Sequence, residues 1–289
     1  MKAVEKIFDR IDVTNYNYKK LIVFPLILVL VSVIILSTVG VNLGVDLRGG
    51  TLATVQGVKY TPEIQDYLIT NLGDSNIKVR SIFSPLTEGF VVETGPDVDS
   101  ARLISLLNQR YPDVAISVQN IGPSLGASFL KQGTQAILFA FLFMAIVVFI
   151  AFRMPIPSAA VVFAALSDML IALAFMSIAG IELSRYTIAA VLMLIGYSVD
   201  TDILLTARVV KEKGDDINER VRSAMRTGLT MSVTTLAALT ALFIFSTSEV
   251  LDDIAIVLIF GLIGDLVMTW LFNAGILKWY ALRRQKGVN

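Results

Sequence analysis

Four aspartates lie within stretches of sequence that are otherwise apolar: Asp168, Asp200, Asp202 and Asp265. A charged side chain at the centre of a membrane costs on the order of 3 kcal/mol, so carboxylates there are rare and usually belong to an ion or proton pathway. The chain contains no histidine and no cysteine. These carboxylates are therefore the main candidates for proton or ion chemistry.

The composition indicates a polytopic membrane protein. Of the 289 residues, 55% are hydrophobic and 17% are charged, and the mean hydropathy is +0.72, too apolar for a soluble domain of this length. The net charge of +0 gives no basic surface for nucleic acid. Without cysteine and histidine, thiol catalysis and most zinc or haem ligands are excluded. We expect no metal, no cofactor and no enzymatic activity, since no nucleophile–base pair is present.

Six apolar runs are each long enough to cross a bilayer as a helix, which needs about 20 residues. The predicted spans are residues 21–40, 134–152, 157–179, 187–207, 229–247 and 254–277. They divide the chain into an N-terminal segment (1–20), a first helix (21–40), a soluble segment (41–133), five further helices (134–277) and a C-terminal segment (278–289).

The distribution of Lys and Arg predicts the orientation. Cations cluster before the first span, between the fourth and fifth, and after the sixth, whereas the alternate loops are poor in them. The positive-inside rule then places both termini in the cytoplasm and residues 41–133 outside. We expect a multi-pass protein of the cell membrane.

The soluble segment has the pattern of a small α/β domain. Strands are predicted at 51–56, 77–83, 90–93 and 114–118, with helices at 62–72 and 98–110. Asp97 is the expected N-cap of the second helix. The order βαββαβ is that of the ferredoxin-like split motif. The predicted fold is thus a six-helix α-helical membrane protein with an extracytoplasmic ferredoxin-like α+β domain between the first two helices.

Depth and helical spacing assign provisional roles to the aspartates. At about 1.5 Å per residue, Asp168, Asp200 and Asp265 fall near the hydrocarbon centre, where they could share one cavity. Asp200 lies on the same side as Gly196 and is the residue expected to take up and release the ion. Asp202 is expected to matter less, because it lies on a polar stripe that supplies local partners. Ion-coupling candidates are Asp168, Asp200, Asp202, Arg208 and Asp265, with a supporting polar path of Ser198, Thr206, Thr230, Ser232 and Thr234.

A structural interpretation competes for each of these residues. A single Ser or Thr in a membrane helix usually bonds its own backbone. A lone Asp can simply hold helices together, and Asp265, beside Gly261 and Gly264, is the strongest candidate for that role. Arg208 equally suits an anchor at the membrane interface. Several carboxylates at one depth are harder to explain structurally, because each needs a partner.

Four sequence segments resemble the SecD/SecF family of protein-export membrane proteins, part of the RND transporter superfamily. Gly196–Arg208 is similar to the fourth-span signature of the SecF type, particularly its archaeal form, and Arg226–Thr235 to the Arg-Thr…Thr-Ser-x-Thr-Thr segment. Val45–Gly50 resembles the Asp-x-x-Gly-Gly motif, with Asp46, Gly49 and Gly50 in the motif positions. Ile121–Gly126 resembles the Gly-Pro segment before the second span.

The resemblance implies an RND-type half of six spans that works with a SecD-like membrane subunit. It also implies contact with the Sec translocon channel and an unfolded translocating polypeptide, driven by an ion gradient. Asp168, Asp200 and Arg208 would belong to the ion path. Asp200 and the Asp-Leu-Arg-Gly-Gly sequence are closer to SecD, but about 90 external residues are too few for SecD.

Two alternative functions remain open from sequence. The first is a stand-alone RND-type transporter of a lipid or small molecule, which needs twice as many spans or a homodimer. The second is a non-conducting scaffold of the translocon, in which Asn could replace the intramembrane Asp residues without effect. Proton and sodium coupling are also both compatible with carboxylates and hydroxyls.

Overall fold

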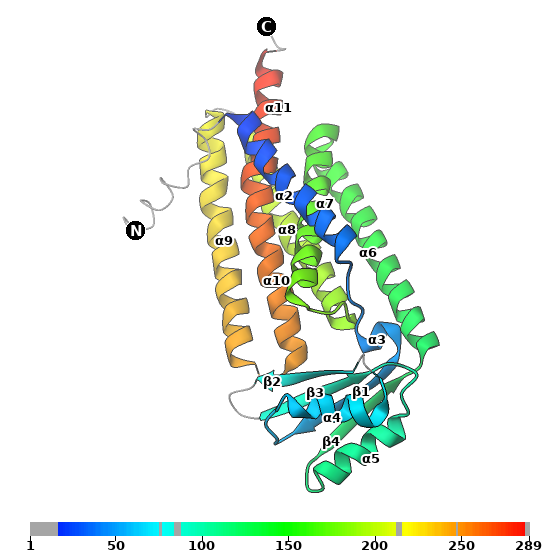
Figure 1. The fold of residues 1–289 in the computed structure, drawn as a ribbon. Coiled ribbons are helices and arrows are strands. Elements are labelled where there is room, and N and C mark those ends of the chain that lie inside the picture. The colour runs from blue at the N-terminus through cyan, green and yellow to red at the C-terminus, as the bar shows by residue number, and fades with distance from the viewer. Residues whose placement is uncertain (1–16, 75–76, 84–87, 212–215, 247, 287–289) are drawn as a thin grey trace.

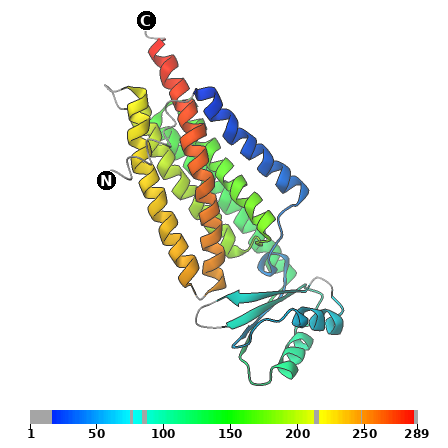
Figure 2. The ribbon, with the colours of Figure 1, turned by 60° about the vertical axis from the view of Figure 1, so that its left-hand side comes forward.

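The structure, a computed structural model, describes residues 17–74, 77–83, 88–211, 216–246 and 248–286. A bundle of long helices carries a small α/β domain at one end (Figure 1). The first described helix begins, and the last one ends, at the opposite end of the bundle in both views (Figures 1 and 2). Most of the predicted N-terminal segment 1–20 lies outside the described residues.

The six predicted membrane helices are confirmed: within the described part of the chain, six helices are long and apolar enough to cross a membrane. They are α2 (Tyr18–Thr38), α6 (Pro123–Phe152), α7 (Pro155–Ala179), α8 (Arg185–Thr206), α9 (Ile217–Phe245) and α10 (Glu249–Val267). Two π-helical segments, η2 (Ala207–Lys211) and η3 (Met268–Asn273), continue α8 and α10, and α11 (Ala274–Lys286) extends the last span.

Helix α6 begins well before the predicted span at residue 134. Gly122 is its N-cap and Pro123 occupies the first turn, where a missing N–H costs nothing and the fixed φ favours the helix. The helix therefore starts at the Gly-Pro segment, about 16 Å before the apolar run on which the prediction rested. This extension brings the beginning of α6 into contact with the α/β domain.

The helices fall into an inner and an outer group. Half or more of the apolar span is buried in α7 (50%), α8 (56%) and the α10–α11 span (56%), compared with 22% or less in α2, α6 and α9. The outer helices expose large apolar side chains, among them Phe24, Ile27, Phe139, Phe143 and Val233. Such surfaces suit lipid or another membrane subunit.

Glycines allow α10 to lie close against its neighbours. A Cβ at Gly261 would come within 2.4 Å of Leu194 on α8, and one at Gly264 within 3.0 Å of Ile171 on α7. Small residues at helix contacts let backbones approach in the membrane. The three inner helices can thus bring side chains from their middles together.

The α/β domain confirms the predicted βαββαβ order. Its elements are α3 (Val45–Arg48), β1 (Gly50–Gln56), α4 (Glu63–Leu72), β2 (Lys78–Phe83), β3 (Glu88–Thr94), α5 (Ser100–Arg110) and β4 (Ile116–Ile121). The sheet has the order β2-β3-β1-β4, and every pairing is antiparallel. The predicted cap Asp97 is wrong: Asp99 accepts from the N–H of Ala101, at 3.0 Å, and begins α5.

The two faces of this sheet have different partners. Ala53, Val55 and Phe90 are fully buried in a core with α4 and α5, and this side points away from the bundle (Figure 2). Because side chains alternate along a strand, the cross-strand row formed by Leu52, Glu93 and Lys78 faces the helix ends instead. Charged residues of the sheet are therefore held against the membrane part of the protein.

Candidate intramembrane ion site

The structure brings three of the four predicted aspartates together. Asp168 on α7, Asp202 on α8 and Asp265 on α10 are each fully buried, with 0% exposed surface. Each lies near the middle of its span, and the close approach of α10 to α7 and α8 brings the carboxyl groups into one hydrogen-bonded cluster. We call Asp168, Asp202, Asp265 and the polar residues bonded to them the carboxylate cluster.

Hydroxyl groups of α8 contact two of the carboxyls. Ser198 Oγ donates to Asp168 Oδ2 at 2.5 Å. Thr201 Oγ1 donates to the carbonyl of Ser198 at 2.9 Å and also lies 3.3 Å from Asp265 Oδ2. Helix α8 therefore links the carboxyl on α7 to the carboxyl on α10.

The last span supplies the remaining contacts. Thr269 Oγ1 lies 2.9 Å from Asp202 Oδ1 and 2.9 Å from Asp265 Oδ1. Asn273 Nδ2 donates to Asp202 Oδ1 at 2.7 Å. Thr269 and Asn273 belong to the π-helical segment η3, a distortion that is often found at functional sites. Asp202 thus takes its partners from the last span.

Sequence reasoning did not find Thr201, Thr269 or Asn273. A usable signal was present for the last two, because Asp265, Thr269 and Asn273 follow at steps of four residues. This spacing places them on one face of a helix, and a polar stripe inside an apolar run points to a buried partner. Thr201 offered no such pattern.

Several buried polar atoms of the cluster lack a hydrogen-bond partner. Asp168 Oδ1, Asp202 Oδ2 and Asn273 Oδ1 are buried and unpaired, and so is Thr206 Oγ1 outside the cluster. Among the described residues, the ion pairs of the protein all lie elsewhere, so no Lys or Arg neutralises these carboxyls. A buried group of acids without a cation has a strong tendency to bind a proton or a small cation.

Asp200 lies outside the carboxylate cluster, which corrects the predicted sharing of one cavity with Asp168 and Asp265. Its side chain is exposed, as are those of Met193 and Tyr197 on the same helix. Residues two apart on a helix point to different sides, so placing Asp202 inward turns Asp200 outward. Asp200 faces the surroundings of this chain rather than its neighbours within it.

Only some residues of the predicted polar path lie at this site. Ser198 and Thr206 are buried on the side of Asp202. Thr230 and Thr234 on α9 are exposed and donate to the carbonyls of Arg226 and Thr230, each at 2.8 Å.

Two further predicted residues also lie apart from the cluster contacts. Ser232 is buried with its hydroxyl unpaired. Arg208 is half-buried in η2, where Nη1 lies 3.4 Å from Ser223 Oγ.

The Asp-x-x-Gly-Gly segment holds the α/β domain and helix α8 together. Asp46 Oδ2 accepts from the backbone N–H of Arg185 at 2.7 Å and from its Nε at 3.2 Å. Arg185 is the first residue of α8, where free N–H groups and the helix dipole favour a carboxylate. Asp46 therefore anchors the beginning of the helix whose middle carries Ser198 and Asp202.

The two glycines of this segment are required by their backbone and surroundings. Gly49 and Gly50 have φ values of 85° and 138°, which residues with a Cβ rarely adopt. A Cβ at Gly49 would come within 2.8 Å of Pro123 Cα, and one at Gly50 within 2.1 Å of the Thr94 carbonyl oxygen. The motif thus packs directly on the Gly-Pro segment that begins α6.

Comparison with known families matches both parts of the chain. The family described as "Protein export membrane protein SecD/SecF, C-terminal" matches residues 103–283, and the "SecD/SecF GG Motif" matches residues 34–58. The second match contains Asp46, Gly49 and Gly50.

Curated relatives agree with these matches. The chain is 46% identical over 275 residues to "Protein-export membrane protein SecF" of Pyrococcus furiosus, covering 92% of each chain. It is 41% identical to the protein of the same name from Methanocaldococcus jannaschii, covering 91% of this chain and 96% of the relative.

The crystal structure of SecDF, a translocon-associated membrane protein from Thermus thermophilus, is similar in fold. The TM-score is 0.75 at 21% identity, and the match covers 93% of this chain but only 39% of that longer chain. The six membrane helices, the ferredoxin-like domain and the Asp-x-x-Gly-Gly motif agree with these matches. Together they show that the chain belongs to the SecF branch of the SecD/SecF protein-export family.

Proposed function

We propose that this chain is a non-enzymatic subunit that couples ion movement across the membrane to the export of unfolded polypeptides. The observation that carries the proposal is the buried cluster of Asp168, Asp202 and Asp265 without a neutralising cation among the described residues. A structural role alone would be served by fewer charges, because unpaired acids are costly at this depth. Membership of the export family supplies the work to which ion movement is coupled.

The hydrogen-bond count of the cluster favours a proton as the ion. Thr269 has a single hydroxyl proton but contacts one oxygen of Asp202 and one of Asp265. Thr201 already donates to the Ser198 carbonyl, so its contact with Asp265 becomes a hydrogen bond when Asp265 is the donor. A carboxyl donates only when protonated. Protons bound by the cluster therefore complete contacts that the side chains alone leave incomplete.

A direct test measures export in cells whose own copy of this subunit is depleted. Maturation of a secreted protein is followed by pulse-chase labelling with and without an ionophore that collapses the proton gradient. We expect this chain to restore the rate of export in the absence of the ionophore, and we expect the ionophore to abolish that restoration. Equal restoration with and without the ionophore would favour the scaffold function, and transport of a lipid or small molecule by the purified chain alone would favour the stand-alone transporter.

The proposed orientation places the α/β domain outside the cytoplasm and both termini inside. The chain has no cysteine, so single cysteines can be introduced at the exposed positions Thr70 on α4 and Glu219 at the beginning of α9. An impermeant maleimide added to intact cells should label Thr70→Cys and not Glu219→Cys. Labelling of Glu219→Cys alone would reverse the topology.

The proposed partner is a SecD-like subunit that covers the exposed face of α8. Asp200 and Tyr197 lie on that face in a part of the helix that belongs to the membrane, where a carboxylate facing lipid is unfavourable. A photoreactive residue in place of Tyr197 should therefore cross-link to a second membrane protein when the complex is purified in mild detergent. The same replacement at Phe24, which is exposed on α2, is the matched control. Exclusive cross-linking to lipid at both positions would contradict the proposal.

A further inference from the structure

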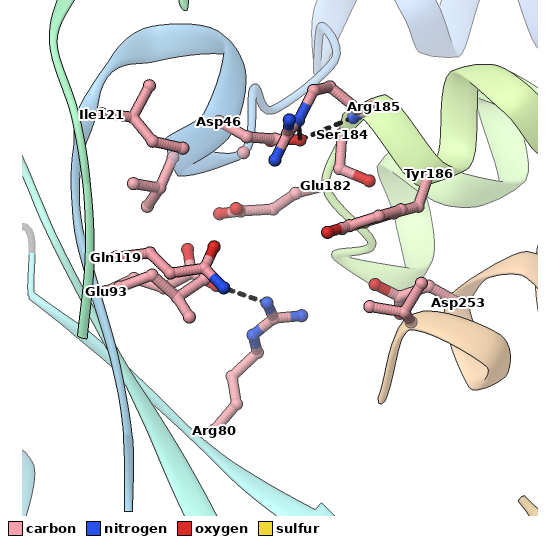
Figure 3. A pocket seen from close by; sticks show the side chains of 14 residues that line it. Asp46, Arg80, Glu93, Gln119, Ile121, Glu182, Ser184, Arg185, Tyr186 and Asp253 are labelled. Atoms are coloured by element: carbon pink, nitrogen blue, oxygen red, sulfur yellow. Dashed lines mark hydrogen bonds and ion pairs between the residues drawn. The ribbon is translucent and has the colours of Figure 1, made fainter. Parts of the chain in front are cut away.

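A cavity of about 80 Å³, lined in part by charged side chains, lies between the α/β domain and the ends of the membrane helices. Figure 3 shows that side chains reach it from both sides: Arg80 and Glu93 from the sheet, and Glu182 and Arg185 from the loop and helix end between α7 and α8. Asp253 on α10 also lines the cavity. None of these residues belongs to the carboxylate cluster, so the cavity needs its own explanation.

Two buried glutamates from the two sides of the cavity lie next to each other in it (Figure 3). Glu93 is 1% exposed and Glu182 is 5% exposed, and each carboxyl group is close enough to influence the other electrostatically. One oxygen of each already has a cation: Lys78 Nζ donates to Glu182 Oε1 at 2.5 Å, and Arg80 donates to Glu93 Oε1. The second oxygen, Oε2, lacks a hydrogen-bond donor in both residues.

Two ionised carboxylates cannot form a hydrogen bond with each other, because each can only accept. A hydrogen bond between these two carboxyls, which would satisfy the Oε2 atoms that lack a donor, therefore requires one proton. We infer that Glu93 and Glu182 together form a proton-binding site, and that the proton they share fastens the α/β domain to the helix ends. This site lies outside the membrane and does not depend on the proposed role of the carboxylate cluster.

The charged groups around Glu93 and Glu182 come from β2, α3, α8 and α10. Lys78 and Arg80 lie on β2, and Arg48 on α3 places Nη2 3.7 Å from Glu93 Oε2. The remaining charges that line the cavity are Asp46 paired with Arg185, and Asp253 on α10. The nearby cations oppose protonation, so the balance between them and burial decides where the proton resides.

Burial decides this balance in favour of protonation at Glu93. Loss of solvent raises the pKa of Glu93 to about 7 from its usual 4.5; Arg80 opposes the rise, and Glu182 adds to it. Burial also acts to raise the pKa of Glu182, but its hydrogen bonds, first that from Lys78, leave this pKa below the usual value. The shared proton therefore resides on Glu93, and the negative charge on Glu182.

The direction of the pH effect follows from this difference. When the two parts separate, water returns to Glu93 and its pKa falls toward the ordinary value, so the docked arrangement binds the proton more tightly. The contribution of Glu93 to docking is then fully present below about pH 4.5 and is lost as the pH rises through about 7. At alkaline pH two carboxylates face each other across the interface.

A second attachment holds the domain whether or not the proton is present. The N–H of Gly44 donates to the carbonyl of Leu183 at 2.8 Å, and Asp46 holds Arg185. These contacts lie beside α3, whereas Glu93 reaches the interface from β3. The Lys78–Glu182 ion pair also remains when the proton is lost. Loss of the proton therefore loosens the sheet, so that it can tilt about the attachment at α3 without detaching the domain.

The tilt can be measured in the full chain, reconstituted in nanodiscs, by distances between two spin labels. Thr70→Cys on α4 and Thr240→Cys on α9 give exposed label sites on the two sides of the interface. We expect a narrow distance distribution at about pH 5.5 and a broader, shifted one at about pH 8.5, with a midpoint near 7. In Glu93→Gln, whose amide donates at any pH, the narrow distribution should persist at both values.

Glu88→Gln is the matched control, since Glu88 is an exposed carboxylate on the same strand, and it should behave like the parent chain. Infrared difference spectra supply a second measurement: the band of a protonated carboxyl present at low pH should lose intensity in Glu93→Gln. Distances that do not change with pH in the parent chain would overturn the inference. So would a Glu93→Gln variant that keeps either the pH response or the full carboxyl band.

Discussion

Asp202→Asn is expected to remove the whole gradient-dependent part of the export rate, leaving the rate seen with an ionophore. Asp202 accepts from Thr269 and Asn273 and is fully buried. Asn retains the size of the side chain but cannot take up and release a proton. The variant should still be produced and should co-purify with its partner, so the loss is measured in vesicles with an imposed proton gradient. A rate equal to that of the parent chain would contradict ion coupling at this residue.

Asp200→Asn is the matched comparison, two residues away on the same helix. The sequence alone favours Asp200 as the ion-binding residue, whereas the geometry favours Asp202, because Asp202 is linked through Thr269 to the carboxyl of Asp265 and Asp200 is exposed. We expect Asp200→Asn to leave the response to the gradient intact and to weaken association with the partner subunit. Loss of the gradient response in Asp200→Asn, with normal assembly, would restore the role first assigned to Asp200.

Gly50→Ala is expected to destabilise the α/β domain by on the order of 4 kcal/mol or more, the range of changes with a severe local cause. The new Cβ would lie 2.1 Å from the carbonyl oxygen of Thr94, and the residue has φ 138°. Thr51 and Thr94 are paired between β1 and β3, so the strands must separate to admit the methyl group. Thermal unfolding of the purified protein in detergent measures the effect as a lower transition temperature.

Gly57→Ala provides the control for backbone strain without a collision. Gly57 also has a positive φ, 85°, but a Cβ there would meet nothing within 4 Å. Only the conformational penalty of about 1 kcal/mol remains. Equal destabilisation by both substitutions would show that strain, and not contact with Thr94, is what makes Gly50 necessary.

The sequence predicted the fold because its signals are long and periodic. Six apolar runs and the alternation of cations define the membrane helices, and strand alternation with two amphipathic helices defines the α/β domain. The beginning of α6 was missed because its first turns lie outside the apolar run. The cap of α5 was misplaced by two residues because Asp97 and Asp99 are both good N-cap residues, and only the path of the chain selects Asp99.

The sequence predicts the depth of the carboxylate cluster in the membrane, but not which residues belong to it. Residue counts place Asp168, Asp200 and Asp265 at similar levels in the membrane, but they do not determine how each helix is rotated about its axis. That rotation is set by contacts such as Gly261 against Leu194, which join residues far apart in sequence. The pair Glu93 and Glu182 is beyond sequence reasoning for the same reason, since 89 positions separate the two residues.

Helix α8 is a continuous α-helix from Arg185 to Thr206, and this continuity has a mechanical consequence. The rise per residue of a helix is nearly fixed, so a displacement of Asp202 along the helix axis reaches Arg185 with little loss, about 25 Å away. Asp46 is bonded to that end through two hydrogen bonds. An axial displacement at the carboxylate cluster must therefore either move the glycine motif with it or break these two bonds. Helix α8 thus transmits displacements between the middle of the membrane and the α/β domain.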